Sequence, residues 1–193
     1  MKDAIARKVR ESHEVSGRFF AENAEGLEAC ARGLAERFRD GGRLLTVGNG
    51  GSACDAALVA VEFIHPIVEK RRPLPAVALT TDVAALTAIG NDLDFSAVFE
   101  RQIEVIARPR DAVLGISTSG ASANVVRAVA RAKTLGLLTI GFAGRDGGRM
   151  VEICDHTFVV KAWSIHRVQE THTMLVHLLW DLVHLAMGQD DVL

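Results

Sequence analysis

The sequence has 193 residues, of which 49% are hydrophobic and 24% charged, and its net charge is −2. This length is typical of one domain with a sizeable core, and the charge does not favour a polyanion such as DNA as a partner. No apolar run is long enough to span a membrane, and the N-terminus has charges where a signal peptide needs an apolar centre. Cys30, Cys54 and Cys154 form neither a metal motif nor an even disulfide set, so we expect a cytoplasmic location.

We expect a single domain over residues 1–193, with an N-terminal helical arm (1–40) and an α/β body (41–193). Residues 3–39 show helical spacing of apolar residues in two sets, and Asn23 is a candidate N-cap for a second helix. A last helix, about 167–187, is also strongly apolar. The arm can pack on the body or pair with the arm of another copy. Because both helical segments need cover, we expect pairing between copies.

From Arg43 onward, apolar runs alternate with helix-like stretches. The candidate strands are Leu44–Val47, Ala76–Leu79, Ala112–Ile116, Leu137–Phe142 and Thr157–Val160. The helix-like stretches between and after them cover about 53–65, 82–89, 96–107, 122–136 and 148–153. This alternation predicts an α/β fold with a five-stranded parallel sheet and helices on both faces. Ligands of such sheets bind beyond the carboxyl ends of the strands.

The most informative stretch follows the third candidate strand. Ser117, Thr118, Ser119 and Ser122 surround Gly120 on a strand-to-helix turn. Free backbone N–H groups at the start of a helix stabilise an anion, and hydroxyls add donors without adding charge. An ordinary serine-rich helix cap is the alternative interpretation.

A glycine-rich turn, Gly48-Asn49-Gly50-Gly51-Ser52, follows the first candidate strand. It resembles a dinucleotide-binding fingerprint, but that motif requires an acid roughly 20 residues later, and Asp82 lies well beyond that distance. We interpret the segment as a tight turn that presents Ser52 and a helix N-terminus to the same anion. Turn glycines with a capping serine are the alternative. No P-loop lysine motif is present in the sequence, which argues against nucleoside triphosphate chemistry.

The helix after this turn carries residues capable of acid–base chemistry. Glu62 stands in an otherwise apolar run, where a buried carboxylate is costly without a partner or a task, so it is either a general base or a solvent-facing residue. Asp55 falls in the first turn, where an acid also favours the helix dipole. His65 precedes Pro66, which ends or kinks the helix, and is either structural or a ligand.

The last helix carries an amide and an imidazole near one face. Gln169 and His177 are about two helical turns apart, whereas Glu170 and His172 point elsewhere. Such a pair can polarise a carbonyl or bind a metal, but a hydrogen-bonded core or interface histidine is equally compatible with the spacing. Asn91 and Asp92, expected in a loop before the helix at 96–107, can reach the same edge of the sheet.

Six segments together resemble one known family. They are Gly48-Asn49-Gly50-Gly51-Ser52, Leu79-Thr80-Thr81-Asp82, Gly90-Asn91-Asp92, Gly115-Ile116-Ser117-Thr118-Ser119-Gly120, Gly144-Arg145-Asp146-Gly147-Gly148 and Val168-Gln169-Glu170-Thr171-His172. In this order they are similar to the phosphoheptose isomerases of the sugar isomerase (SIS) domain superfamily. The resemblance implies a homotetramer with active sites at subunit interfaces. It also implies interconversion of sedoheptulose 7-phosphate and D-glycero-D-manno-heptose 7-phosphate for bacterial heptose synthesis.

The resemblance also implies roles for individual residues. Glu62 matches the general base and His177 the general acid, which move a proton between C1 and C2 through an enediol. Residues implied to bind the phosphate are Ser52, Ser117, Thr118, Ser119 and Ser122. Residues implied to bind the rest of the substrate are Asn49, Gly50, Gly51, Asn91, Asp92 and Gln169. Zinc is implied as a cofactor of some members, with Glu62, Gln169 and His177 as matching ligands.

The sequence departs from the family pattern at two positions. Leu58 replaces the first ligand histidine, and Pro66 replaces a basic residue that is frequent in the family. His65 is a possible substitute zinc ligand if the break at Pro66 turns it inward. Two other functions therefore remain open: a non-catalytic SIS module that binds a sugar phosphate or another protein, and an isomerase of a different sugar phosphate.

Overall fold

A computed structural model describes residues 1–67 and 71–191 of the chain. In chain order, the elements are α1 (Lys2–Arg39), β1 (Leu44–Gly48), α2 (Gly51–Ile64), β2 (Ala76–Ala78), α3 (Val83–Asp92), the 3₁₀ helix η1 (Phe95–Ala97), α4 (Val98–Ile106), β3 (Ala112–Ser117), α5 (Ala123–Thr134), β4 (Leu138–Gly144), α6 (Met150–Ile153), β5 (His156–Val160) and α7 (Ile165–Ala186).

The five strands form one parallel sheet in the order β2-β1-β3-β4-β5. This confirms the expected sheet, with several strand ends shifted by one or two residues. Gly48 at the end of β1 lies opposite Ile116 of β3, and Ser117 at the end of β3 lies opposite Ala143 of β4. The loops after β1 and β3 therefore emerge side by side at one edge of the sheet.

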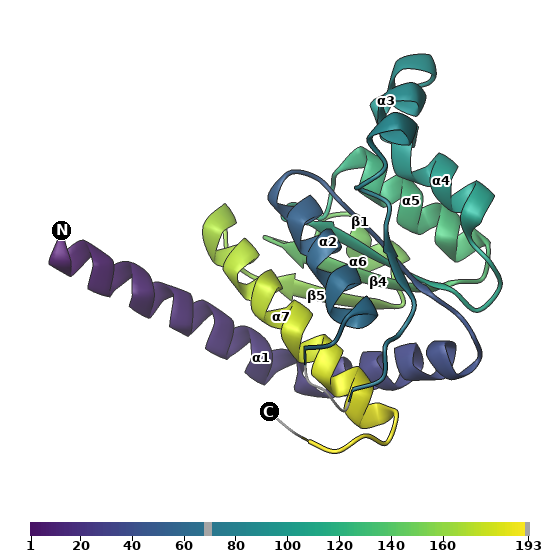
Figure 1. The fold of residues 1–193 in the computed structure, drawn as a ribbon. Coiled ribbons are helices and arrows are strands. Elements are labelled where there is room, and N and C mark those ends of the chain that lie inside the picture. Colours follow the sequence, from purple (N-terminus) through teal and green to yellow (C-terminus); the bar gives the residue numbers. More distant parts are fainter. Residues whose placement is uncertain (68–70, 192–193) are drawn as a thin grey trace.

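Helices cover both faces of the sheet (Figure 1). Helices α1, α2 and α7 pack on one face against side chains such as Leu44 and Leu114. Helices α4, α5 and α6 pack on the other face against Leu45 and Val113. Because neighbouring residues of a strand point to opposite faces, a strand covered on both sides must be apolar throughout. Every residue of β1, β3 and β4 is accordingly buried.

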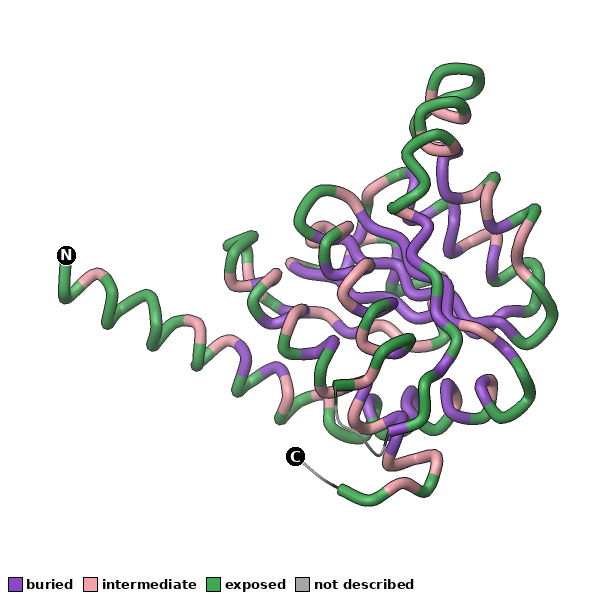
Figure 2. The backbone as a smooth tube through the Cα atoms, viewed as in Figure 1, coloured by how far each residue is buried: buried purple, intermediate pink, exposed green. Residues whose placement is uncertain are grey.

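The N-terminal arm is one continuous helix, α1, so the expectation of a second helix capped by Asn23 is wrong. The Asn23 side chain instead donates to the Phe19 carbonyl one turn earlier, 2.7 Å away. No proline interrupts the segment, and an asparagine inside a helix can bond back to its own backbone. The second half of α1 buries residues such as Leu34 against the body, whereas the first half projects from it and exposes Ile5 and Val9 (Figures 1 and 2).

Helix α3 also projects from the body, and none of its residues is buried (Figures 1 and 2). Asp82 caps its start by accepting a hydrogen bond from the Ala85 backbone. Asn91 and Asp92 were expected in a loop, but they form the last turn of α3 because the helical pattern continues through Gly90. In the part of the chain that the structure describes, no helix has the length and apolar character needed to cross a membrane.

Candidate active site

The loop between β1 and α2 is shaped by close backbone packing. A side chain on Gly48 would overlap the backbone of Ser52, so the end of the strand lies directly against the first turn of the helix. Gly50, with φ of 54°, adopts the left-handed conformation that glycine tolerates. Ser52 is only 4% exposed and lies in the first turn of α2, where backbone N–H groups are free of helical partners.

The loop between β3 and α5 gathers three hydroxyls. Ser117 Oγ lies 2.9 Å from Ser122 Oγ and 3.4 Å from Ser119 Oγ. Ser122 precedes the first residue of α5, yet its side chain makes no capping hydrogen bond because it turns toward Ser117. Gly120, with φ of 62°, approaches Gly147 so closely that no side chain fits there. The simple-cap interpretation therefore does not account for this loop.

A pair of asparagines joins the two loops. Asn49 Nδ2 donates to Asn124 Oδ1 over 2.8 Å, and Asn124 Nδ2 donates back to Asn49 Oδ1 over 2.9 Å. The first residue follows β1, and the second lies in the first turn of α5. The hydroxyl-bearing turns predicted to bind one anion are thus held together by a direct side-chain contact.

Helices α2 and α7 meet along a seam with polar residues at successive turns. Gln169 of α7 sits on Gly51 so closely that a Cβ on this glycine would overlap the amide. One turn along each helix, Thr173 Oγ1 donates to Asp55 Oδ1 over 3.0 Å. Asp55 is 7% exposed, and burial raises the pKa of its carboxyl while the Thr173 hydrogen bond lowers it.

The seam continues to the two residues predicted to act as base and acid. His177 Nε2 lies 3.9 Å from Glu62 Oε1 in the same chain. The Glu62 side chain is 17% exposed and the His177 side chain 55% exposed. A carboxylate that is largely withdrawn from water thus faces an accessible imidazole, at a separation too long for a direct hydrogen bond. This geometry suits two groups that flank a reacting substrate.

In the described part of the chain, His, Cys, Asp and Glu side chains alone do not make a zinc site; the implied ligand set also contains the amide of Gln169. Among the residues that the structure describes, no three His, Cys, Asp or Glu side chains lie close enough to hold a metal ion. Leu58, one turn before Glu62, is aliphatic and packs against the core. His65 follows the last residue of α2 as its C-cap, has a non-helical backbone conformation and is exposed. We therefore derive no chemical step through zinc.

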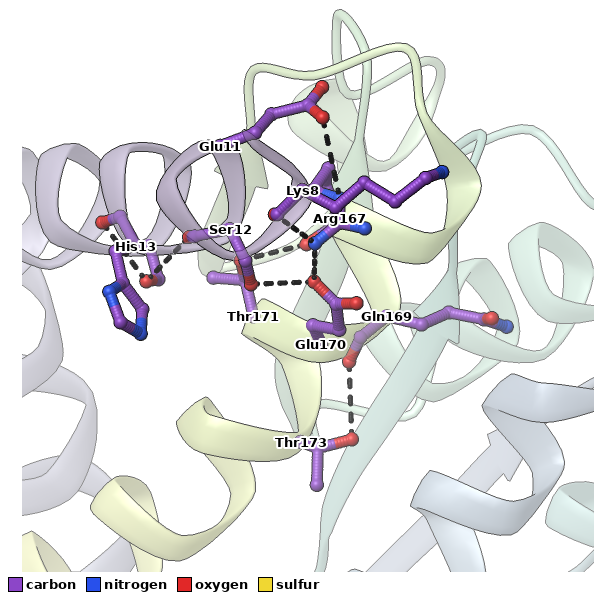
Figure 3. Close-up of polar contacts among 10 residues, drawn as sticks. Lys8, Glu11, Ser12, His13, Arg167, Gln169, Glu170, Thr171 and Thr173 are labelled. Carbon is purple, nitrogen blue, oxygen red and sulfur yellow. Dashed lines mark hydrogen bonds and ion pairs between the residues drawn. The ribbon is translucent and has the colours of Figure 1, made fainter. Parts of the chain in front are cut away.

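The other faces of α7 serve packing. His172 is fully buried and lies 3.1 Å from the carbonyl of Ala143 through Nε2. Glu170 accepts hydrogen bonds from Ser12 of α1 and from Arg167, while Gln169 points away from this contact (Figure 3). The predicted division of α7 into a functional face and a packing face agrees with these contacts.

The structure leaves two predicted substrate residues apart from the others. Asn91 Nδ2 donates to Asp92 Oδ1 at the exposed end of α3, and both side chains are accessible to a second molecule. Sequence reasoning had in turn missed Asn124 and Thr173, which contact the loops and the seam. The only local signal for Asn124 is a polar residue among small and apolar ones at the start of α5.

Comparison with known proteins places this fold in a family. A family model described as SIS domain matches residues 9–144. A phosphoheptose isomerase of Aquifex aeolicus is 44% identical over 183 residues, which cover 95% of this chain and 96% of that protein. A phosphoheptose isomerase of Solidesulfovibrio magneticus is 46% identical over 93% of this chain and 87% of its own length.

A solved structure agrees with these sequence matches. The phosphoheptose isomerase of Neisseria gonorrhoeae superposes with a TM-score of 0.88 at 36% identity, covering 94% of this chain and 97% of that one. An identity of 36% over nearly the whole of both chains exceeds what a shared fold alone would produce. The chain belongs to the phosphoheptose isomerases of the SIS domain family.

Proposed function

We propose that this protein is an aldose–ketose isomerase that interconverts sedoheptulose 7-phosphate and D-glycero-D-manno-heptose 7-phosphate. The observation that supports the proposal is the approach of Glu62 to His177, a carboxylate and an imidazole 3.9 Å apart in one chain. The family membership supports the choice of substrate. The hydroxyl-bearing loops after β1 and β3 suit the phosphate, because they offer donors and helix N-termini to an anion.

The reaction needs one proton to move between neighbouring carbons. Starting from the ketose, the Glu62 carboxylate takes a proton from C1 while the imidazolium of His177 gives a proton to the carbonyl oxygen at C2, which produces an enediol. Glu62 then returns its proton to C2, and the C1 hydroxyl proton goes back to His177 as the C1 carbonyl forms. Atoms and charge balance, and no redox partner is needed.

The substrate also has to be held in one orientation. Ser52, Ser117, Ser119 and Ser122, with the backbone N–H groups of the first turns of α2 and α5, are proposed to bind the phosphate, with Thr118 beside them. Gln169 lies over Gly51 at the start of the α2–α7 seam. It is therefore proposed to bind the sugar between the phosphate and the acid–base pair.

We also propose a homotetramer in the cytoplasm, with Asn91 and Asp92 reaching a site of a neighbouring subunit. The uncovered apolar surface of α1 and the absence of buried residues in α3 support assembly. The free thiols of all three cysteines suit a reducing compartment. Light scattering coupled to size-exclusion chromatography tests the assembly, and a monomer at micromolar concentration would contradict it.

Proton exchange tests the proposed reaction directly. In deuterated water, the protein should convert sedoheptulose 7-phosphate to the aldose and incorporate deuterium at C2, as followed by NMR. Glu62→Gln should lower both rates by about 10²- to 10⁴-fold, the usual contribution of a general base. The matched control is Glu152→Gln, the same change at an exposed position of α6, which should leave the rates unchanged.

The alternative of a non-catalytic module predicts a different outcome. A protein that binds the sugar phosphate but neither exchanges nor isomerises it, with or without added zinc, would refute the enzymatic proposal. Leu58 and Pro66 are the features that favour this alternative. Leu58 removes a donor from the face of α2 that carries Glu62, and Pro66 replaces a basic residue.

A further inference from the structure

The contact between Asn49 and Asn124 has features that an incidental surface contact lacks. Asn124 is 3% exposed, and its side chain uses both its donor and its acceptor. Its Oδ1 also accepts the backbone N–H of Val125 over 2.9 Å. This backbone contact identifies Oδ1 as the acceptor, which leaves Nδ2 to donate to Asn49 and so defines the orientation of both amides.

The sheet by itself does not set the distance between the two loops. Backbone pairing of β1 with β3 ends at Gly48 and Ile116, and the two loops leave the sheet after Gly48 and Ser117. Asn49 is the first residue beyond this pairing, and the β3–α5 loop turns back over Gly120 before α5 begins. The amide pair is therefore a clamp just beyond the end of the strands.

The chemistry of the clamp suits a phosphate site. Two amides bridge the loops with no net charge, whereas a salt bridge would place a carboxylate near a bound dianion. Each of the two hydrogen bonds contributes a modest net stabilisation. Together they can hold Ser52 at a fixed distance from the hydroxyls that surround Ser117. Both loops are then already in place for the same anion before it binds.

We infer that Asn124 is a positioning residue, which sets the separation of the two phosphate-binding loops through Asn49. The inference rests on the proposed function in that it assumes a phosphate between these loops, but it does not depend on isomerisation. Asn124 itself need not touch the substrate. Its loss should weaken phosphate binding and raise KM, while the α2–α7 seam and kcat are largely retained.

Calorimetric titration with inorganic phosphate and with sedoheptulose 7-phosphate tests this inference without requiring turnover. Asn124→Ala should weaken binding of both probes by about tenfold, the equivalent of the two lost hydrogen bonds. Asn124→Asp should weaken binding further, because it removes the donor to Asn49 and adds a negative charge. If turnover is measured, KM should rise by the same factor and kcat should fall less than about threefold.

Asn23 provides a matched control. It is a partly buried asparagine of α1 whose side chain, among the described residues, bonds to its own helix, so Asn23→Ala and Asn23→Asp should leave phosphate affinity unchanged. Thermal unfolding of every variant separates positioning from stability. If either Asn124 variant fails to fold, phosphate affinity is measured on Asn124→Ser instead. Serine is polar, but its side chain is too short to reach Asn49.

The outcomes distinguish this inference from the proposed reaction. Asn124 variants with a lowered melting temperature but wild-type phosphate affinity would show a merely structural role and overturn it. A wild-type protein that binds neither probe would overturn it as well. A wild-type protein that binds phosphate but does not isomerise the sugar would refute only the proposed reaction, and the affinity changes would still decide the role of Asn124.

Discussion

The burial of His172 makes a specific prediction about stability and pH. The imidazole is fully buried between the sheet and α7, and Nε2 donates to the Ala143 carbonyl. Burial lowers its pKa from the ordinary 6.5 to about 4, although the hydrogen bond to Ala143 acts in the opposite direction. The ring is therefore neutral in the folded protein at a pH where the unfolded chain would already be protonated.

The sign and size of the effect follow from this difference. Above about pH 6.5, the histidine is neutral in both the folded and the unfolded state, so it does not make the free energy of unfolding depend on pH. As the pH falls from 6.5 toward 4, the unfolded chain binds a proton that the folded protein does not, and the free energy of unfolding decreases by about 1.4 kcal/mol per pH unit. The loss is about 2 kcal/mol at about pH 5 and stops at about 3 kcal/mol below the folded-state pKa.

Urea unfolding at about pH 7.5 and about pH 5, at one protein concentration, measures this loss. His172→Gln retains an N–H donor for Ala143 but cannot titrate, so its stability should differ between the two pH values by about 2 kcal/mol less than that of the wild type. His166→Gln, an exposed change in the first turn of α7, is the control. Equal pH dependence in the wild type and His172→Gln would refute the argument from burial. The pKa of His184 is also lowered to about 4, by burial and then by the Arg71 charge, so some pH dependence should remain in the variant.

Three further predictions concern the site. Leu58→His places an imidazole one helical turn before Glu62, and metal analysis of the variant should show about one zinc ion per chain. An unchanged zinc content would contradict the prediction that this face of α2 carries zinc ligands. Gly51→Ala should displace the Gln169 amide and raise KM in the isomerase assay. The free energy of unfolding should change by less than about 1 kcal/mol, because only a flexible side chain has to move. An unaltered KM would argue against a substrate role for Gln169. Thr173→Val leaves both Asp55 carboxylate oxygens without a partner among the described residues and should lower the free energy of unfolding by about 1–3 kcal/mol. Thr173→Ser keeps the hydroxyl and should recover this stability. A valine variant as stable as the wild type would count against the Thr173–Asp55 contact.

Much of the fold follows from patterns that extend over only a few residues. Strand and helix stretches were recognisable from Arg43 onward, because a strand buried on both faces is apolar throughout and a covering helix repeats its apolar residues every turn. The arm was predicted less well. Two apolar sets suggested two helices, but one helix can change its buried face along its length when its buried residues begin only at Ser16.

The sequence by itself determined which kinds of groups this protein brings to its site. The hydroxyls after β3, the glycines after β1 and a carboxylate in an apolar helix are all local features, each with a chemical reason to be noticed. The tertiary structure decided which of these groups meet. Glu62 and His177 lie far apart along the chain, as do Asn49 and Asn124, and their contacts depend on how the α2–α7 seam and the β1–β3 pairing align distant segments. Such alignment arises from packing of the whole core, which no short stretch of residues encodes.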